Sequence, residues 1–185
     1  MLKHRQIITS SAIICGVLVI DQFIKVMVKT SMQLHESIRI TDWFYIFYVE
    51  NNGMAFGLEP IAKWLLTVLR IVAVIAIAVY MVKCIKRHAP TGFITCLALI
   101  VAGAAGNIID CLFYGIIWGY ETLLNGRVVD MFYFPLFEWD WPLWLPIVGG
   151  NHCIFFSPVF NFADAAISCG IIAILLFYNK RLLKA

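Results

Sequence analysis

Four long apolar runs constrain the fold of this chain more than any other feature of its sequence. They lie at about residues 7–28, 61–82, 91–109 and 162–178. Each is close to the roughly 20 residues that a helix needs to cross the hydrocarbon core of a bilayer. Charged residues make up only 14% of the chain, against about 25% in a soluble domain. We therefore predict an all-α membrane protein with four transmembrane helices, in which residues 1–185 form a single domain.

The distribution of charge predicts how these helices are oriented. Basic residues gather, without acidic neighbours, at the N-terminus, at residues 83–87 and at residues 180–184. All 11 acidic residues lie in the two long connections or in the adjoining ends of the helices. Because cytoplasmic loops are enriched in Lys and Arg, we expect both termini and the short loop at 83–90 to be cytoplasmic.

The two long connections are then expected on the outer face, and they differ in composition. The first, at about residues 29–60, alternates apolar and polar residues, which predicts short β-strands. The second, at about residues 110–161, is long and aromatic. Its rings are typical of an interfacial belt and also suit a surface that contacts a substrate, so both interpretations stay open. We expect the segment at 138–146 of this connection to lie over the functional site of the protein. A disulfide is conceivable only between Cys111 and Cys153.

Charged side chains at membrane depth are candidates for function because their burial in a bilayer is unfavourable. Five of them fall near the outer ends of the predicted helices or in the connection between them: Asp21, Lys25, Asp110, Asp130 and Asp164. Asp21 and Lys25 are spaced i, i+4 on one helix face, so they can form an ion pair, which serves structure as readily as catalysis. Asp130 is expected in a polar loop of the second connection.

Several acids at one membrane level favour a pair of carboxyl groups. Two carboxyl groups held close together cannot easily both ionise, so one keeps its proton. The ionised partner can accept a proton from water while the protonated one polarises a carbonyl. The sequence has no G-x-S-x-G motif and no C-x-x-C pair of the kind that binds zinc. The residues alone thus predict peptide-bond hydrolysis by two acids and leave open which acids these are.

Five short motifs follow one another in a definite order along the chain. They are DQFIK at residues 21–25, NNGMAFG at 51–57, GAAGNIID at 103–110, VVDM at 128–131 and FNFAD at 160–164. In this order the chain resembles bacterial lipoprotein signal peptidase (signal peptidase II) over nearly its whole length.

The resemblance implies a role for each motif. The two catalytic aspartates would be Asp130 and Asp164. The other motif residues would shape the site or bind substrate: Asp21, Lys25, Asn51, Gly53, Asn107, Asp110, Asn161 and Ala163. Neither a cofactor nor a metal ion is implied. Gly103 and Gly106 are expected to allow close packing between helices.

The resemblance also implies a substrate and a location. The substrate would be a prolipoprotein whose cysteine already carries a diacylglyceryl group, and the enzyme would cut just before that cysteine. The protein would be a multi-pass peptidase of the bacterial inner (cytoplasmic) membrane, with its active site at the outer face. We expect it to be a monomer that contacts membrane lipid and no nucleic acid.

The sequence departs from the family at the position after Asp110, where the family carries arginine and this chain has Cys111. Arg70 is the unexpected charge inside the second apolar run. One interpretation is that its side chain snorkels toward the outer headgroups. The other is compensation, in which the guanidinium replaces the missing arginine and binds the carboxylate of Asp110.

Two other functions compete with peptidase activity as interpretations of this sequence. A small ion-coupled transporter would use the same acids, but it predicts acids at mid-bilayer and paired half-repeats, and no repeat is visible in this sequence. A non-enzymatic membrane scaffold would not need two aspartates accompanied by asparagine-containing motifs.

Overall fold

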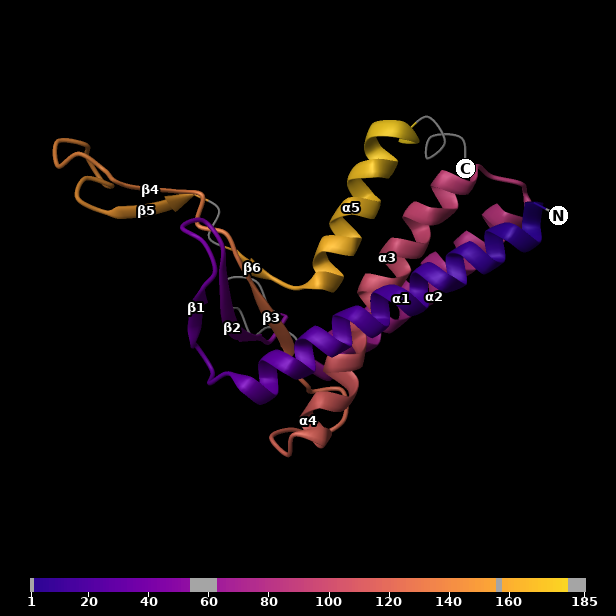
Figure 1. The fold of residues 1–185 in the computed structure, drawn as a ribbon, viewed down its shortest axis with the longest axis horizontal. Helices are drawn as coiled ribbons and strands as arrows, with labels where there is room; N and C mark the ends of the chain where they lie inside the picture. Colours follow the sequence, from indigo (N-terminus) through magenta and orange to yellow (C-terminus); the bar gives the residue numbers. More distant parts are fainter. Residues whose placement is uncertain (1, 54–62, 156–157, 180–185) are drawn as a thin grey trace.

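The computed structural model describes residues 2–53, 63–155 and 158–179. Its long helices are α1 (Leu2–Ser31), α2 (Lys63–Lys86), α3 (Thr91–Ile109) and α5 (Phe162–Phe177) (Figure 1). The first residues of the second predicted span, residues 54–57 of the second motif and the basic cluster after residue 179 lie outside the described residues.

Three helices in the described part of the chain are long and apolar enough to cross a membrane: α1, α2 and the continuous helix Thr91–Ile117. The protein is therefore a mostly helical membrane protein. The fourth predicted span corresponds to α5, which is apolar but has only 16 residues. At 1.5 Å per residue a helix of that length extends about 24 Å, somewhat less than the ~30 Å hydrocarbon core.

Helix α3 is the centre of the bundle. More than half of its most apolar stretch is buried, 56%, against 17% in α1 and 11% in α2. The expected close packing at two glycines is present. A Cβ at Gly103 would lie 2.3 Å from the carbonyl oxygen of Ala163, and one at Gly106 would lie 2.7 Å from Oδ2 of Asp21. The backbone of α3 thus approaches both α5 and α1 where the polar residues gather.

At its C-terminal end, α3 changes from α-helical to π-helical geometry. It continues as a π-helical turn (Asp110–Tyr114) and then as a short α4 (Gly115–Ile117). Single π-turns within α-helices are frequent at functional sites. In this protein the turn begins at Asp110, whose side chain is fully buried.

A four-stranded antiparallel sheet lies at the end of the bundle opposite the N-terminus (Figure 1). Its strands, in spatial order, are β1 (Ser37–Arg39), β2 (Tyr45–Asn51), β3 (Val128–Tyr133) and β6 (Val159–Phe160). The first two confirm the strands predicted for the first outer connection.

Strand β3 corrects the expectation that Asp130 lies in a polar loop. Asp130 sits inside β3 opposite Val49 of β2 and is only 2% exposed. Its neighbours Val129 and Met131 belong to a buried cluster with Val28 of α1 and with Tyr48 and Tyr114. This apolar contact with α1 and with the π-helical turn that follows α3 buries the segment as a strand, which alternation of residue types alone did not reveal.

The remaining strands, β4 (Phe137–Asp140) and β5 (His152–Phe155), form a hairpin. The expectation that the segment at 138–146 lies over the site is wrong, because the hairpin projects from the sheet away from the helices (Figure 1). Leu143, Trp144 and Ile147 at its tip are almost fully exposed. The conceivable disulfide is not formed either: Cys153 on β5 and Cys111 in the π-turn are both free thiols.

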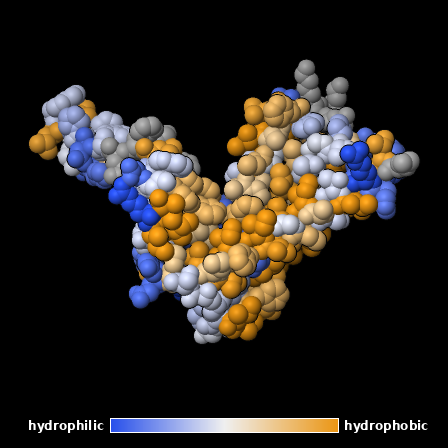
Figure 2. Space-filling view, viewed as in Figure 1, coloured by the Kyte–Doolittle hydropathy of each residue, from blue (hydrophilic) through white to orange (hydrophobic). Residues whose placement is uncertain are grey.

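The surface of the bundle is apolar, as a lipid-facing surface requires. Figure 2 shows apolar side chains covering the helices and a hollow between the sheet and α5. Large exposed apolar side chains on three helices include Val19, Phe23, Leu69, Val72, Ile75, Leu175, Leu176 and Phe177. By contrast, Asp21, Lys25 and Asp110 are fully buried, so these three charged groups are kept away from the apolar surface of the bundle.

Candidate active site

A buried lysine holds two carboxylates together at the end of the bundle nearest the sheet. The Nζ atom of Lys25 lies 2.9 Å from Oδ2 of Asp21 and 2.8 Å from Oδ2 of Asp110, and all three side chains are 0% exposed. The predicted i, i+4 ion pair is thereby confirmed. Lys25 also donates to Oδ1 of Asn107 at 2.8 Å, which satisfies the three N–H donors of an ammonium group.

The two carboxylates extend this cluster to the other elements. Oδ1 of Asp21 accepts the backbone N–H of Ala163 at 2.9 Å. Asp110 accepts the backbone N–H of Val129 at 3.3 Å and the side-chain amide of Gln22 at 2.9 Å. One cluster therefore joins α1, the outer end of α3, β3 and the first turn of α5.

Two asparagines connect this cluster by hydrogen bonds to the predicted catalytic acids. Because Oδ1 of Asn107 accepts from Lys25, its Nδ2 is turned to donate to Oδ1 of Asp164 at 2.8 Å. Nδ2 of Asn161 donates both to Oδ1 of Asn107 at 3.1 Å and to Oδ1 of Asp130 at 2.6 Å.

Asp164 is fixed by the start of α5. Asn161 is the N-cap residue, and its Oδ1 accepts the backbone N–H of Asp164 at 2.9 Å. In return, Oδ2 of Asp164 accepts the backbone N–H of Asn161 at 3.3 Å, which completes a capping box. The N-terminal end of a helix carries partial positive charge and stabilises a carboxylate there.

Asp130 has a different environment on β3. Besides Asn161, it accepts a hydrogen bond from Nδ2 of Asn51 at 3.1 Å. Burial raises the pKa of Asp130 to about 7, and the negative charge of Asp164 acts in the same direction, while the two amide donors oppose the rise. Asp130 is thus able to hold a proton near neutral pH while Asp164 lies where a carboxylate is stabilised.

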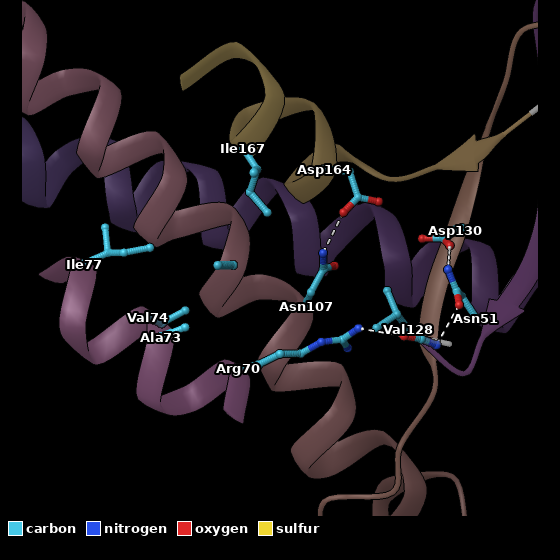
Figure 3. A pocket seen from close by; sticks show the side chains of 12 residues that line it. Asn51, Arg70, Ala73, Val74, Ile77, Asn107, Val128, Asp130, Asp164 and Ile167 are labelled. Atoms are coloured by element: carbon cyan, nitrogen blue, oxygen red, sulfur yellow. Dashed lines mark hydrogen bonds between the residues drawn. The ribbon is translucent and has the colours of Figure 1, made fainter. Parts of the chain in front are cut away.

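Both carboxyl groups face one pocket of about 290 Å³, and Figure 3 shows them turned toward the same space from α5 and from β3. The polar part of its lining, together with a glycine, comes from Asn51, Gly53, Arg70, Asn107, Asp130 and Asp164. The apolar part comes from Ala73, Val74, Ile77, Ala104, Val128 and Ile167. Such a pocket accommodates a ligand with a polar backbone and apolar side groups.

Arg70 points into this pocket from α2, although not in the way that the compensation hypothesis expects. Its Nη1 donates to Sγ of Cys111 at 3.4 Å and its Nη2 donates to the carbonyl oxygen of Gly53 at 3.3 Å. The prediction of a bidentate contact between Arg70 and Asp110 is wrong, because Lys25 provides the cation for that carboxylate. Arg70 does reach Cys111, the position where the family carries arginine.

The structure brings described residues of all five motifs to one place, and it adds one motif residue to which the sequence analysis assigned no role. Ala163 takes part through its backbone N–H, and Gly53 donates its N–H to Oδ1 of Asn51 at 2.7 Å. The added residue is Gln22, which donates to Asp21, to Asp110 and to the carbonyl oxygen of Gly106. An amide in an apolar run, next to Asp21, was the signal that could have identified it.

Within residues 2–53, 63–155 and 158–179, no group of three or more His, Cys, Asp or Glu side chains is arranged to hold a metal ion.

Known proteins resemble this chain over most of its length. A family model described as signal peptidase (SPase) II matches residues 13–180. A lipoprotein signal peptidase of Porphyromonas gingivalis is 47% identical over 186 residues, which cover 92% of this chain and 82% of the relative. One from Amoebophilus asiaticus is 37% identical over 178 residues, which cover 85% of this chain and 72% of the relative.

Two solved structures of bacterial membrane enzymes have similar folds. Both give a TM-score of 0.64, at 25% and 26% identity. The first alignment covers 95% of this chain and 88% of the enzyme, and the second covers 91% and 90%. None of these similarities supports the ion-coupled transporter considered from the sequence.

Replacing Lys25 by methionine tests the buried cluster. Lys25→Met leaves Asp21 and Asp110 buried without their cation, and removing one partner of a buried ion pair destabilises a protein by about 3–5 kcal/mol. We expect a clear fall in the melting temperature in detergent and a loss of activity. Adding Asp110→Asn should recover part of the stability.

The matched control is Lys86→Met, which removes an exposed lysine at the other end of the bundle. It should leave the melting temperature unchanged. A Lys25→Met protein as stable as the parent would show that the cluster does not hold the outer ends of the helices together.

Proposed function

Because this chain belongs to the signal peptidase II family and removes signal peptides from prolipoproteins, we propose that Asp130 and Asp164 are its catalytic pair. The observation that carries the proposal is their shared pocket, in which Asn161 and Asn107 bridge the two carboxyl groups. The two acids also have unlike environments, as a division of labour between acid and base requires.

The unlike environments assign the roles. Asp130, whose pKa is raised to about 7, keeps its proton and donates a hydrogen bond to the carbonyl oxygen of the scissile peptide. Asp164, as a carboxylate, accepts a proton from a water molecule that attacks the carbonyl carbon. The tetrahedral intermediate then collapses when a proton reaches the leaving nitrogen and the C–N bond breaks. No covalent bond to the enzyme forms in this sequence of steps.

The substrate of the proposed reaction is a prolipoprotein that carries a diacylglyceryl group on the cysteine just after the scissile bond. A substrate of this kind is held in the bilayer by its signal peptide and its acyl chains, so it approaches the pocket laterally. The apolar side chains that line the pocket from α2 and α5 suit that approach: Ala73, Val74, Ile77 and Ile167.

The proposed topology places this pocket at the outer face of the bacterial inner membrane. In it, α5 is a fourth, short span that packs on α3, both termini are cytoplasmic, and the protein acts as a monomer. The support is the apolar composition of α5 and the basic residues at the start of α1 and at the end of α2, which are the helix ends remote from the sheet (Figure 1).

Substitution of either aspartate tests the catalytic pair. Asp130→Asn and Asp164→Asn keep the size of the side chain and remove the ionisable group, so each should abolish cleavage of a diacylglyceryl prolipoprotein while the protein still inserts and remains folded. Cleavage is measured by gel shift with purified protein in detergent.

The control is Asp42→Asn, which alters an exposed acid paired with Arg39 on the outer sheet. It should cleave at the parent rate. If either active-site variant cleaved at a rate close to that of the parent, the role proposed for that aspartate would be wrong.

The pH dependence follows from Asp130. Its carboxyl is the proposed proton donor, so kcat/KM should fall as pH rises through about 7, the pKa of Asp130. The folded-state pKa lies above the ordinary value of 3.8. Proton binding at Asp130 therefore stabilises the fold fully at low pH, and this contribution is lost as pH rises through about 7.

Because asparagine does not titrate, a comparison of Asp130→Asn with the parent provides a second measurement. The melting temperature of Asp130→Asn relative to the parent should rise between about pH 4 and pH 7 and be level above that, whereas Asp42→Asn should show no such trend. A relative melting temperature that did not change with pH would contradict the raised pKa.

Labelling of single cysteines tests the topology. In a background without reactive native cysteines, a membrane-impermeant reagent added to intact spheroplasts should label cysteine placed at Glu36 or Glu121. It should not label cysteine at Arg87 until the membrane is permeabilised. All three positions are exposed in the structure, so failure to react reports the membrane. Labelling at Arg87 from outside would overturn the proposed orientation.

A further inference from the structure

Arg70 is the one residue of the pocket whose charge the proposed mechanism does not use. It extends from α2 toward the polar part of the pocket (Figure 3). A guanidinium group has five N–H donors. Among the residues that the structure describes, its hydrogen-bond acceptors are two uncharged atoms, Sγ of Cys111 and the carbonyl oxygen of Gly53.

The nearby carboxylates are already occupied by other donors. Lys25, Gln22 and the N–H of Val129 bind Asp110. Asn51 and Asn161 bind Asp130. Among the described residues, the guanidinium is therefore directed at neutral acceptors, and its remaining donors lie at the edge of a cavity.

Gly53 preserves this placement. Its φ of 75° lies in the left-handed region, and a Cβ there would lie 2.5 Å from Nη2 of Arg70. Glycine thus allows the backbone of the turn to approach the guanidinium closely. The turn that carries Asn51 and the cation on α2 form one wall of the pocket.

The chemistry of the pocket limits what Arg70 can bind. Asp130 and Asp164 share the cavity with it, and the negative charge of the Asp164 carboxylate disfavours an anionic ligand. Ala73, Val74 and Ile77 continue the wall from Arg70 along α2, where they suit apolar groups. A ligand with uncharged oxygen acceptors and apolar side chains fits both features, and an extended peptide has this composition.

We propose that Arg70 binds a backbone carbonyl oxygen of the substrate's signal-peptide segment, near the bond that the two aspartates cleave. The substrate oxygen takes donors of Arg70 that face the cavity, and neighbouring apolar side chains pack against Ala73, Val74 and Ile77. Successive residues of an extended chain are about 3.3 Å apart, so the contact fixes how far the chain advances into the pocket. This assignment rests on the proposed function of the same site.

The test separates binding from chemistry. The dissociation constant of a fluorescent diacylglyceryl peptide that spans the cleavage site is measured in the Asp130→Asn background, with and without Arg70→Met. A hydrogen bond to a charged group stabilises a complex enough that its loss should weaken binding roughly 10- to 100-fold. In the otherwise unaltered enzyme, Arg70→Met should raise KM by a similar factor and leave the pH at which kcat/KM falls unchanged.

A second part of the test asks whether arginine at position 111 restores peptide binding to Arg70→Met. Cys111 lies 3.4 Å from Nη1 of Arg70, so arginine at that position can bring its guanidinium to the same place. Arg70→Met/Cys111→Arg should bind the peptide more tightly than Arg70→Met alone. The matched control is Arg39→Met, an exposed arginine on β1, which should bind like its parent.

Three outcomes would overturn the proposal. Unchanged binding in Arg70→Met, together with a lower kcat and a shifted pH profile, would show that Arg70 only holds the turn at Gly53. A loss confined to the lipidated peptide, compared with the same peptide without its diacylglyceryl group, would assign Arg70 to the lipid esters. A double variant no better than Arg70→Met would exclude a transferable guanidinium contact. Cleavage by Asp130→Asn would count against the catalytic pair instead, since the binding measurement does not depend on it.

Discussion

The ion pairs of the buried Lys25 ammonium group are the interaction on which the half of this protein nearest the sheet depends. The ammonium group neutralises Asp21 and Asp110, and those carboxylates in turn accept the backbone N–H groups of Ala163 and Val129. The cation therefore positions the first turn of α5 and the strand β3, the two elements that carry the proposed catalytic acids. Its third bond orients the amide of Asn107, which donates to the carboxylate of Asp164. A purely apolar contact between the helices would not provide this orientation, because dispersion forces have no direction.

The two aspartates show how one residue type acquires two roles. Asp130 lies within a buried strand and receives side-chain amides, whereas Asp164 lies at a helix N-terminus and receives a backbone N–H as well as an amide. Burial favours the neutral form of a carboxyl group and a helix N-terminus favours the charged form. The fold therefore places two carboxyl groups with unlike environments in one pocket, as the proposed proton donor and proton acceptor require. For the third charged group of that pocket, Arg70, we propose a role in recognition of the substrate.

The sequence predicted the parts of this structure that depend on local composition. Long apolar runs identify helices because about 20 residues of such composition have few alternatives to spanning a bilayer, and the ordered motifs identified the polar residues of the site. The sequence did not predict that Asp130 lies in a strand. That strand pairs with β2, from which α2, α3, the π-turn and α4 separate it in the sequence, and burial against α1 and the π-turn decides its structure. The partners of Arg70 and the direction of the β4–β5 hairpin likewise depend on tertiary packing.

The amide of Asn161 has a consequence for which substitutions this chain can tolerate. Serine, threonine and aspartate are all good N-cap residues in an ordinary helix, because each supplies the oxygen that the first turn needs. Here the same side chain must also donate N–H groups to Asp130 and to Asn107, and carboxylates have none to give while a hydroxyl has only one. The start of α5 could therefore be preserved by several residue types, but the chemistry could be preserved by asparagine alone. Helix stability alone would tolerate several residue types at position 161, but the two hydrogen bonds that the Asn161 amide donates restrict the position to asparagine.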